Sequence, residues 1–404
     1  MKALRKYLDK IKPKFEEGGK LHAFRSVFDG FETFLFTPRT TSTSGVHIHD
    51  SNDSKRTMII VVLALIPCLL FGMYNAGYQH WLAIGDTSFP FWSMLLYGFL
   101  AILPTIVVSY AVGLGIEFVV AQWRGEEIQE GFLVTGMLIP LICPIDTPIW
   151  MIAVATAFAV IFAKEVFGGT GYNIFNVALV ARAFLFFAYP AKMSGDKVFV
   201  AHDTIFGLGG QSIAADGVTG ATPLGQIATH VGDTAPVVND LAGNAISTWD
   251  AFIGLIPGSF GETSTLCILI GAAILLFTGV ANWRVILSVF VGGAAMASLS
   301  YALQSPTYPA SMINPIDQLM LGGFAFAAVF MATDPVTGAR THTGQYIYGF
   351  LIGVLAILIR VYNTGYPEGA MLAILLMNAF APLIDYCVVQ SNIRRRMRRV
   401  NVKK

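Results

Sequence analysis

The fold is decided by a short apolar stretch, residues 132–148, which reads FLVTGMLIPLICPIDTP. Its apolar part ends at Cys143, well short of the roughly twenty residues that a helix needs to cross a bilayer. A glycine and a proline interrupt it, so a straight spanning helix is not expected there. A second stretch of this kind, residues 321–333, opens beside a Gly-Gly pair and closes at Asp334-Pro335. Broken helices at corresponding positions are typical of an inverted repeat, with a site near the membrane midplane.

The composition places the whole chain in the membrane. Its 404 residues are 55% hydrophobic and 13% charged, with a mean hydropathy of +0.63. A soluble domain carries roughly 25% charged residues. The net charge of +1 gives no reason to expect nucleic acid as a partner. The cysteines show no C-x-x-C spacing, so neither an iron–sulfur ligand set nor a disulfide framework is expected from Cys68, Cys143, Cys267 and Cys387.

The apolar pattern predicts an all-α polytopic protein with about ten transmembrane helices. The segments cover residues 57–75, 91–122, 131–143, 147–164, 172–190, 264–281, 284–303, 316–333, 345–362 and 369–388. A constant offset aligns Lys164, Gly169, Ala183 and Phe184 with Arg360, Gly365, Ala379 and Phe380. We therefore predict two inverted five-helix repeats, residues 57–190 and 263–390, with broken half-helices.

The distribution of Lys and Arg predicts the orientation. Cations follow alternate segments, and the tail 391–404 is strongly basic, so both termini are expected in the cytoplasm. The connection 191–262 is rich in Asp and is expected outside. The arm 1–56 lacks the apolar core of a signal peptide. Residues 2–11 predict a short amphipathic helix on the membrane surface or on a partner subunit, with a solvated leader as the alternative.

A polar motif lies in the outside connection. Residues 216–222 read DGVTGAT, and small neighbours leave the hydroxyls of Thr219 and Thr222 uncrowded, as an acceptor site requires. Taken alone, the motif is more often an ordinary surface turn.

This motif resembles the Ser/Thr-Gly-Ala-Thr flavinylation motif of membrane subunits of sodium-translocating NADH:quinone oxidoreductases and of the related ferredoxin:NAD oxidoreductases. In those families the last Thr carries FMN through a phosphoester bond, which implies covalent FMN on Thr222, with Thr219, Gly220 and Ala221 beside it. The resemblance covers nearly the whole chain and is greatest to the family of B subunits of the sodium pumps. It implies a multi-subunit complex of the bacterial inner membrane that passes electrons to quinone and exports sodium.

A glycine-rich break, residues 164–176, leads into another apolar segment. Its backbone N–H groups are expected to be free for a phosphate or a ring carbonyl, with Gly169 at the turn. It resembles the part of the B subunits where Asn side chains lie near a non-covalent riboflavin, which implies that role for Asn173 and Asn176. Their spacing of three would put both amides on one helix face, and helix capping is the equal alternative. Arg182 is a candidate partner for flavin phosphate or for a carboxylate.

Acidic residues within the apolar segments are costly, roughly 2.5–3.5 kcal/mol each at a helix centre. Gly113 and Glu117 match a Gly-Gly pair and a Glu that the family links to quinone and sodium, although Leu114 replaces the second Gly. Asp334 and Asp385 match acidic positions implied in sodium uptake. Each has a structural alternative: Glu117 at the membrane interface, Asp334 as a helix cap, Asp385 paired with the basic tail.

Three functions remain open at this point. The sodium-pump subunit is favoured by the charged arm 1–56, which is shorter in the homologous subunit of the ferredoxin-linked complex. A flavin-free solute carrier could also use broken helices in an inverted repeat. The sequence contains no NADH-binding fingerprint, so hydride removal from NADH is expected in another subunit.

Overall fold

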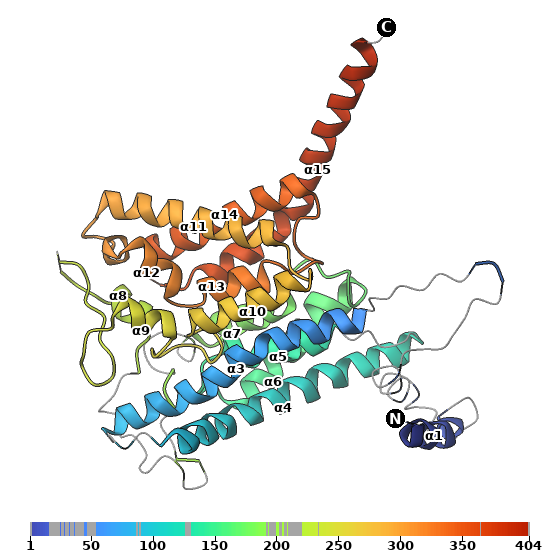
Figure 1. The fold of residues 1–404 in the computed structure, drawn as a ribbon, viewed down its shortest axis with the longest axis horizontal. Coiled ribbons are helices and arrows are strands. Elements are labelled where there is room, and N and C mark those ends of the chain that lie inside the picture. The colour runs from blue at the N-terminus through green and yellow to red at the C-terminus, as the bar shows by residue number, and fades with distance from the viewer. Residues whose placement is uncertain are drawn as a thin grey trace.

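The structure is a computed structural model of an all-helical chain (Figure 1). Apart from isolated residues, it describes 2–15, 44–46, 54–85, 90–125, 131–190, 199–201, 220–232, 234–363 and 365–402. Among all the described residues the only β-structure consists of two isolated bridges in the 191–262 connection. The predicted all-α polytopic class is confirmed, because six helices are long and apolar enough to cross a membrane.

The helices before the outside connection follow the predicted segments closely. They are α3 (Ser54–Ile84), α4 (Phe91–Arg124), α5 (Phe132–Ile142), α6 (Ile149–Ala159) with its π-helical and 3-10 continuations η3 (Val160–Lys164) and η4 (Glu165–Phe167), and α7 (Val177–Ala188). In the arm, α1 (Lys2–Ile11) confirms the predicted helix and is followed by η1 (Lys12–Lys14).

The connection itself contributes two short helices, α8 (Pro223–Ala228) and α9 (Thr248–Ile253). After it come α10 (Thr265–Phe277), α11 (Trp283–Leu303), η6 (Pro309–Met312), the broken run α12 (Pro315–Met320), α13 (Phe324–Phe326) and η7 (Ala327–Met331), then α14 (His342–Tyr362) and α15 (Ala370–Val402). The break predicted beside Gly322 is present, and this glycine has a φ of +67°.

Two predicted spans are shorter than the sequence indicates. The segment 172–190 forms α7 only from Val177, because Asn176 caps its start and the preceding glycines at 168, 169 and 171 have positive φ. The segment 264–281 ends as α10 at Phe277, where Gly279 at φ +71° turns the chain. Apolar composition continued past both helix ends, so hydropathy alone placed these boundaries too far out.

The helices before the outside connection, α3 to α7, form the first helix set, and those after it, α10 to α15, form the second. The two sets pack against one another through equivalent helices. The first helices of the two sets, α3 and α10, pack together, and so do the last, α7 and α15. Short α5 contacts α3, α4 and α7, while the broken run α12–α13–η7 contacts the corresponding α10, α11 and α15. These equivalent contacts support the predicted repeat. The domain boundaries and the orientation in the membrane stay predictions.

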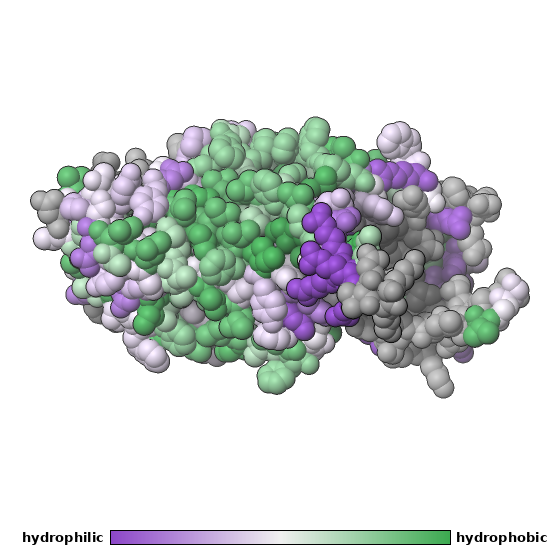
Figure 2. All heavy atoms as spheres, turned by 90° about the horizontal axis from the view of Figure 1, so that it is seen from above, coloured by the Kyte–Doolittle hydropathy of each residue, from purple (hydrophilic) through white to green (hydrophobic). Residues whose placement is uncertain are grey.

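The outer surface has the pattern of a membrane protein. Figure 2 shows apolar residues over the middle of the visible face and hydrophilic ones towards its ends. Many large apolar side chains are exposed on the helices, among them Leu70, Trp92, Val119, Phe162, Leu299 and Phe380. The basic end of α15 projects away from the bundle (Figure 1).

Glycines allow a close contact between α11 and α14. A Cβ added at Gly353 would lie 2.1 Å from the Val289 carbonyl oxygen and 2.5 Å from the Gly293 nitrogen, both backbone atoms. We expect Gly353→Ala to destabilise the protein by about 1–3 kcal/mol, because the helices must separate. Gly115→Ala is the matched control, since nothing lies within 4 Å of its added Cβ. Unfolding titrations in mixed micelles would measure both, and equal stability of the two variants would contradict this packing.

Candidate functional site

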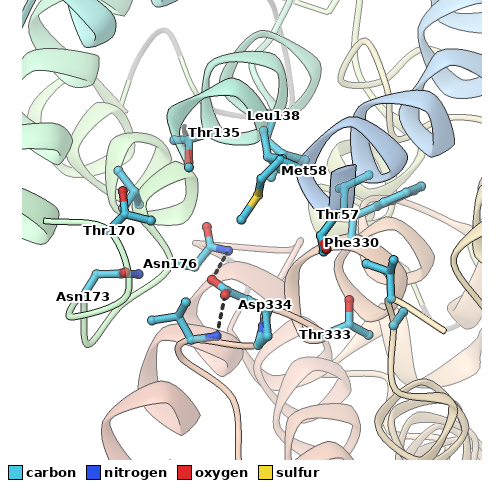
Figure 3. Close-up of a pocket in the computed structure, with 18 of the residues that line it drawn as sticks. Thr57, Met58, Thr135, Leu138, Thr170, Asn173, Asn176, Phe330, Thr333 and Asp334 are labelled. Atoms are coloured by element: carbon cyan, nitrogen blue, oxygen red, sulfur yellow. Dashed lines mark hydrogen bonds between the residues drawn. The ribbon is translucent and has the colours of Figure 1, made fainter. Parts of the chain in front are cut away.

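A polar cavity of about 120 Å³ lies where the two helix sets meet (Figure 3). Its walls come from the start of α3, from α5, from the loop before α7, and from the ends of α10 and η7. The lining includes Thr57, Met58, Thr135, Lys164, Thr170, Asn173, Asn176, Phe330, Thr333 and Asp334. Hydroxyls, amides and one carboxylate thus line a cavity whose remaining surface is apolar. We call it the Asn176 cavity.

The structure brings together three residues that separate parts of the sequence single out. Asn173, Asn176 and Asp334 all line the Asn176 cavity. The Asn176 side-chain nitrogen donates to an Asp334 carboxylate oxygen at 3.3 Å, and the other carboxylate oxygen accepts from the Val336 backbone at 2.9 Å. Both contacts are drawn in Figure 3. The first of these bonds links residues 158 positions apart and joins the two helix sets.

The prediction that both Asn amides share a helix face is wrong. Asn176 caps α7 by accepting from the Leu179 nitrogen at 3.2 Å, and Asn173 lies before the helix, donating to the Phe175 carbonyl. The capping alternative is therefore correct for Asn176. The N–H of Gly169 is not free either, because it donates to the Lys164 carbonyl at 3.0 Å. The polar surface of the Asn176 cavity therefore comes from side chains more than from free backbone N–H groups.

Glu117 lies next to this cavity and is paired. Its carboxylate accepts a short hydrogen bond from Lys164, which lines the cavity. Both side chains are 5% exposed, so the pair is shielded from water. Gly113, one turn earlier on α4, lies against the Phe132 ring, where an added Cβ would fall 1.8 Å from Cζ. The structure thus gives Gly113 a packing role and Glu117 an internal counter-ion.

The predicted sodium carboxylates do not form one ligand cluster. Among the described residues, no three His, Cys, Asp or Glu side chains come together in a way that could hold a metal. Asp385 instead accepts from the backbone nitrogens of Arg340 and Thr341, at 2.7 and 3.0 Å, and from the Thr341 hydroxyl at 2.6 Å. Asp385 thus holds the start of α14 against α15. These three donors satisfy its carboxylate without a bound ion.

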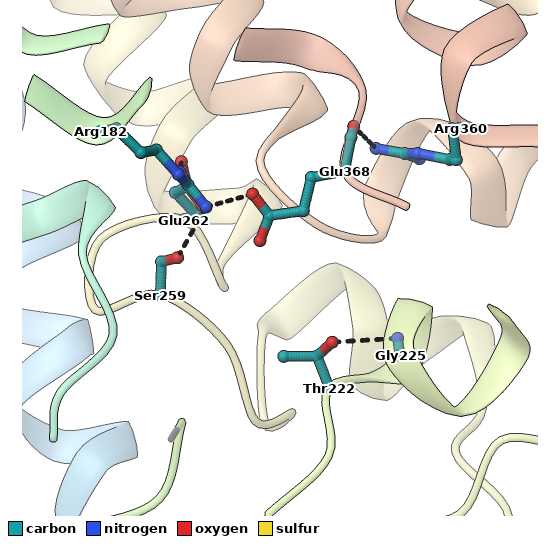
Figure 4. Close-up of polar contacts among 7 residues, drawn as sticks. All are labelled: Arg182, Thr222, Gly225, Ser259, Glu262, Arg360 and Glu368. Atoms are coloured by element: carbon teal, nitrogen blue, oxygen red, sulfur yellow. Dashed lines mark hydrogen bonds and ion pairs between the residues drawn. The ribbon is translucent and has the colours of Figure 1, made fainter. Parts of the chain in front are cut away.

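Thr222 lies in a second, smaller cavity of about 20 Å³. It caps α8, accepting from the Gly225 nitrogen at 3.1 Å, and only 8% of it is exposed (Figure 4). The expectation of an uncrowded hydroxyl is therefore wrong for Thr222, because this residue is the buried N-cap of α8. Gly220 and Ala221 precede it as predicted, whereas Thr219 lies outside the described residues.

A buried ionic cluster forms one wall of the Thr222 cavity. Arg182 donates to Glu262 at 2.7 Å, to the Ser259 hydroxyl at 3.4 Å and, through a short bond, to Glu368 (Figure 4). Ser259, Glu262 and Glu368 all line the cavity. Burial raises the pKa of Glu262 to about 7, against the lowering effect of Arg182, and the nearby Glu368 raises it further. Of the two partners predicted for Arg182, the structure contains the carboxylate.

The two cavities lie at opposite ends of the helical bundle. The start of α3, which borders the Asn176 cavity, is at the right-hand end in Figure 1, and α8, which follows Thr222, is at the left-hand end. Each cavity uses residues at or just before the start of the first helix of a set, residues 57–58 within the first turn of α3 and residues 256–263 before α10, and residues just before the last helix of that set. Equivalent places of the repeat therefore form polar cavities at opposite ends.

Sequence comparison identifies the relatives of this chain. A family model described as the NQR2, RnfD, RnfE family matches residues 41–394. The chain belongs to this family. It is 45% identical to the Na(+)-translocating NADH-quinone reductase B subunit of Chromohalobacter salexigens, over 98% of this chain and 96% of that protein. Proteins of the same name from Klebsiella pneumoniae and Pseudomonas aeruginosa are 43% and 42% identical, each over 98% of this chain and 99% of the relative.

Membership of the NQR2, RnfD, RnfE family confirms the resemblance found in the motifs. Several charged residues of the site were nevertheless not predicted from the sequence. Glu262 was counted only as an acidic residue of the outside connection, and Lys164 and Arg360 only as cations. The sequence did offer one signal for these partners, the cost of burying a charge. Because Arg182 lies among aromatic and apolar residues, it needs carboxylate partners from other parts of the chain.

Proposed function

We propose that this chain is the membrane-embedded B subunit of a sodium-translocating NADH:quinone reductase, an electron-carrying subunit that passes electrons to quinone while the complex exports sodium. The observation that carries the proposal is identity of 42–45% over nearly the full length of relatives with that name. NADH oxidation belongs to another subunit. The helices support a multi-pass membrane protein, and we propose the bacterial inner membrane, with both termini in the cytoplasm.

The proposed covalent cofactor is FMN, joined by a phosphoester bond to the Thr222 hydroxyl. Thr222 fits this role in part. Its oxygen accepts from Gly225, which leaves the hydroxyl proton replaceable by phosphorus. The cavity of about 20 Å³ has room for one or two water-sized groups and not for a flavin ring. The ring must therefore extend out of this cavity, while the phosphate end lies beside Thr222.

The proposed non-covalent cofactor is riboflavin in the Asn176 cavity, where Asn173 and Asn176 offer amide donors and acceptors to an isoalloxazine edge. The volume of about 120 Å³ is similar to that of an engineered cavity that takes a single benzene ring. One ring of the flavin fits within these walls, and the others need the cavity mouth. When bound, flavins supply one- and two-electron transfer; the chain's own residues hold them and limit water.

We propose that acidic residues of the two helix sets contact sodium, and that Gly113 and Glu117 contact quinone. Glu117 and Asp334 adjoin the Asn176 cavity, and Gly113 lies on the same face of α4 as Glu117. Asp334 offers carboxylate oxygen beside the helix break, a suitable environment for sodium. Asp385 is the weakest of the sodium candidates, because it does not line the Asn176 cavity and its carboxylate holds the start of α14.

The first test concerns Thr222. We expect the purified chain, made in a host with an active flavin transferase, to fluoresce on a denaturing gel and Thr222→Ala to be dark. Thr229→Ala is the matched control, because it removes a hydroxyl outside the motif, at the other end of α8, and should leave the fluorescence unchanged. Mass spectrometry of the loop peptide should detect the added mass of one FMN on Thr222. A dark wild-type chain would favour a flavin-free solute carrier of this fold, which the family model alone does not separate from a redox subunit.

A second expectation concerns sodium. Asp334→Asn should raise the sodium concentration for half-maximal quinone reduction by the assembled complex roughly tenfold, the equivalent of losing about 1.4 kcal/mol of binding. Glu117→Gln is expected to act in the same direction, since it unpairs Lys164 beside the cavity. Asp385→Asn serves as the comparison, with loss of stability but little change in sodium dependence. An unchanged sodium dependence in Asp334→Asn would remove this residue from the ion path.

A further inference from the structure

Arg360, near the end of α14, is a buried cation that forms no salt bridge with a described residue. It is 2% exposed. It donates to the backbone carbonyls of Gln318 and Glu368, the second at 3.4 Å, and its Nε has no partner. No carboxylate of a described residue lies within 4.0 Å of it. A guanidinium buried with only neutral acceptors is costly, so a missing counter-ion is indicated.

The repeat shows how the equivalent position is neutralised. Lys164 occupies that place, 196 positions earlier (360 − 164), at the end of the helix formed by α6 and η3. It pairs directly with Glu117 of α4. The corresponding helix of the second set, α11, has no acidic residue between Trp283 and Leu303. The second set therefore contains the buried cation and lacks its protein counter-ion.

Arg360 borders the Thr222 cavity. Gly322 and Glu368 line that cavity. The carbonyl of Glu368 accepts from Arg360, as Figure 4 shows, and an added Cβ on Gly322 would lie 3.4 Å from Nη2 of Arg360. Leu224, two residues after Thr222, lines this cavity and also a smaller adjoining one that Arg360 lines. The cation thus lies beside Gly322, Leu224 and Glu368, three of the residues that line the Thr222 cavity.

The neighbouring carboxylates pair with Arg182 and not with Arg360. Arg182 holds the side chains of both Glu262 and Glu368, so these two acids share one guanidinium. Of the two arginines and two glutamates in this cluster, Arg360 is the member that lacks an ion pair.

We propose that Arg360 is the counter-cation of the phosphate group attached to Thr222. The ligand is the singly charged phosphodiester of a bound FMN, and the proposal rests on the proposed flavinylation of Thr222. A planar guanidinium suits phosphate oxygens in both charge and geometry. The phosphate supplies the negative charge that pairs with Arg360 in the second repeat, as the Glu117 carboxylate pairs with Lys164 in the first. Arg360 is a positioning residue, since it acts on the linker and not on the flavin ring.

The test compares thermal unfolding of flavinylated and unflavinylated chains. Each protein is made in hosts with and without the flavin transferase, as wild type, Arg360→Met and Arg360→Lys. Flavinylation should raise the Tm of wild type by about 2–4 °C more than that of Arg360→Met, because only the wild type gains an ion pair. Arg360→Lys keeps the charge and should retain most of the increase. Arg360→Gln, which keeps donors for both carbonyls, replaces the Met variant if that variant does not fold.

The control is the double variant Glu117→Leu, Lys164→Met, which removes the equivalent pair at the other cavity. Its flavin-dependent increase in Tm should equal that of wild type. Equal increases in wild type and in both neutral Arg360 variants would overturn the assignment of Arg360. A wild-type chain without flavin on Thr222 would instead defeat the proposed function, so the two failures are distinguishable.

Discussion

Arg182→Ala is expected to lower the free energy of unfolding by about 3–5 kcal/mol. The substitution removes the only cation that contacts Glu262 and Glu368 among the described residues, at side-chain exposures of 6% and 18%. Two carboxylates would then remain buried beside each other without compensation. Unfolding titrations of the purified chain in mixed micelles would measure the loss.

The control for this prediction is Arg340→Ala, since Arg340 is exposed and its link to Asp385 uses its backbone nitrogen. We expect this change to stay within about 0.5 kcal/mol. Adding Glu262→Gln to Arg182→Ala should recover part of the stability, because one of the uncompensated charges disappears. A loss in Arg182→Ala no larger than in Arg340→Ala would show that the cluster does not hold the two helix sets together.

Lys164→Ala is expected to have an effect of similar size, about 3–5 kcal/mol, because it leaves Glu117 as a single buried charge. One oxygen of this carboxylate already has no partner, so nothing else compensates it. Glu117→Ala should destabilise in the same way by isolating Lys164.

The double variant Glu117→Leu, Lys164→Met should be far more stable than the sum of the single changes indicates, since no charge is left unpaired. A double-mutant cycle on unfolding free energies checks this. Additive effects would mean that the two side chains do not interact in the folded protein. Quinone reduction by the double variant would then report separately whether the charges serve function as well as stability.

Much of the fold could be predicted because membrane helices leave strong local patterns. The break at Gly322 and the short α5 followed from glycine and proline within apolar runs. The ends of α7 and α10 could not, since apolar residues continue beyond them and a cap or a glycine at positive φ decides where the helix stops. Hydropathy averages over a window, whereas caps act at single residues.

The candidate site was predictable residue by residue but not as an arrangement. Asn176 and Asp334 were each singled out by the family resemblance of their own segment, yet their contact spans 158 positions and depends on how the repeats pack. The burial of Thr222 depends in the same way on distant parts of the chain, because Ser259 and Gly322 line the same cavity. Periodicity within one segment carries no information on such distant neighbours.

The placement of the two cavities at opposite ends of the bundle makes the proposed electron path electrogenic. An electron that passes between a flavin linked to Thr222 and one in the Asn176 cavity moves a negative charge along the helices and so across much of the bilayer. A membrane potential of 100 mV changes the free energy of moving one charge across the full bilayer by about 2.3 kcal/mol. Electron transfer in one direction is therefore slowed by the cell's own voltage, and in the other direction it is assisted.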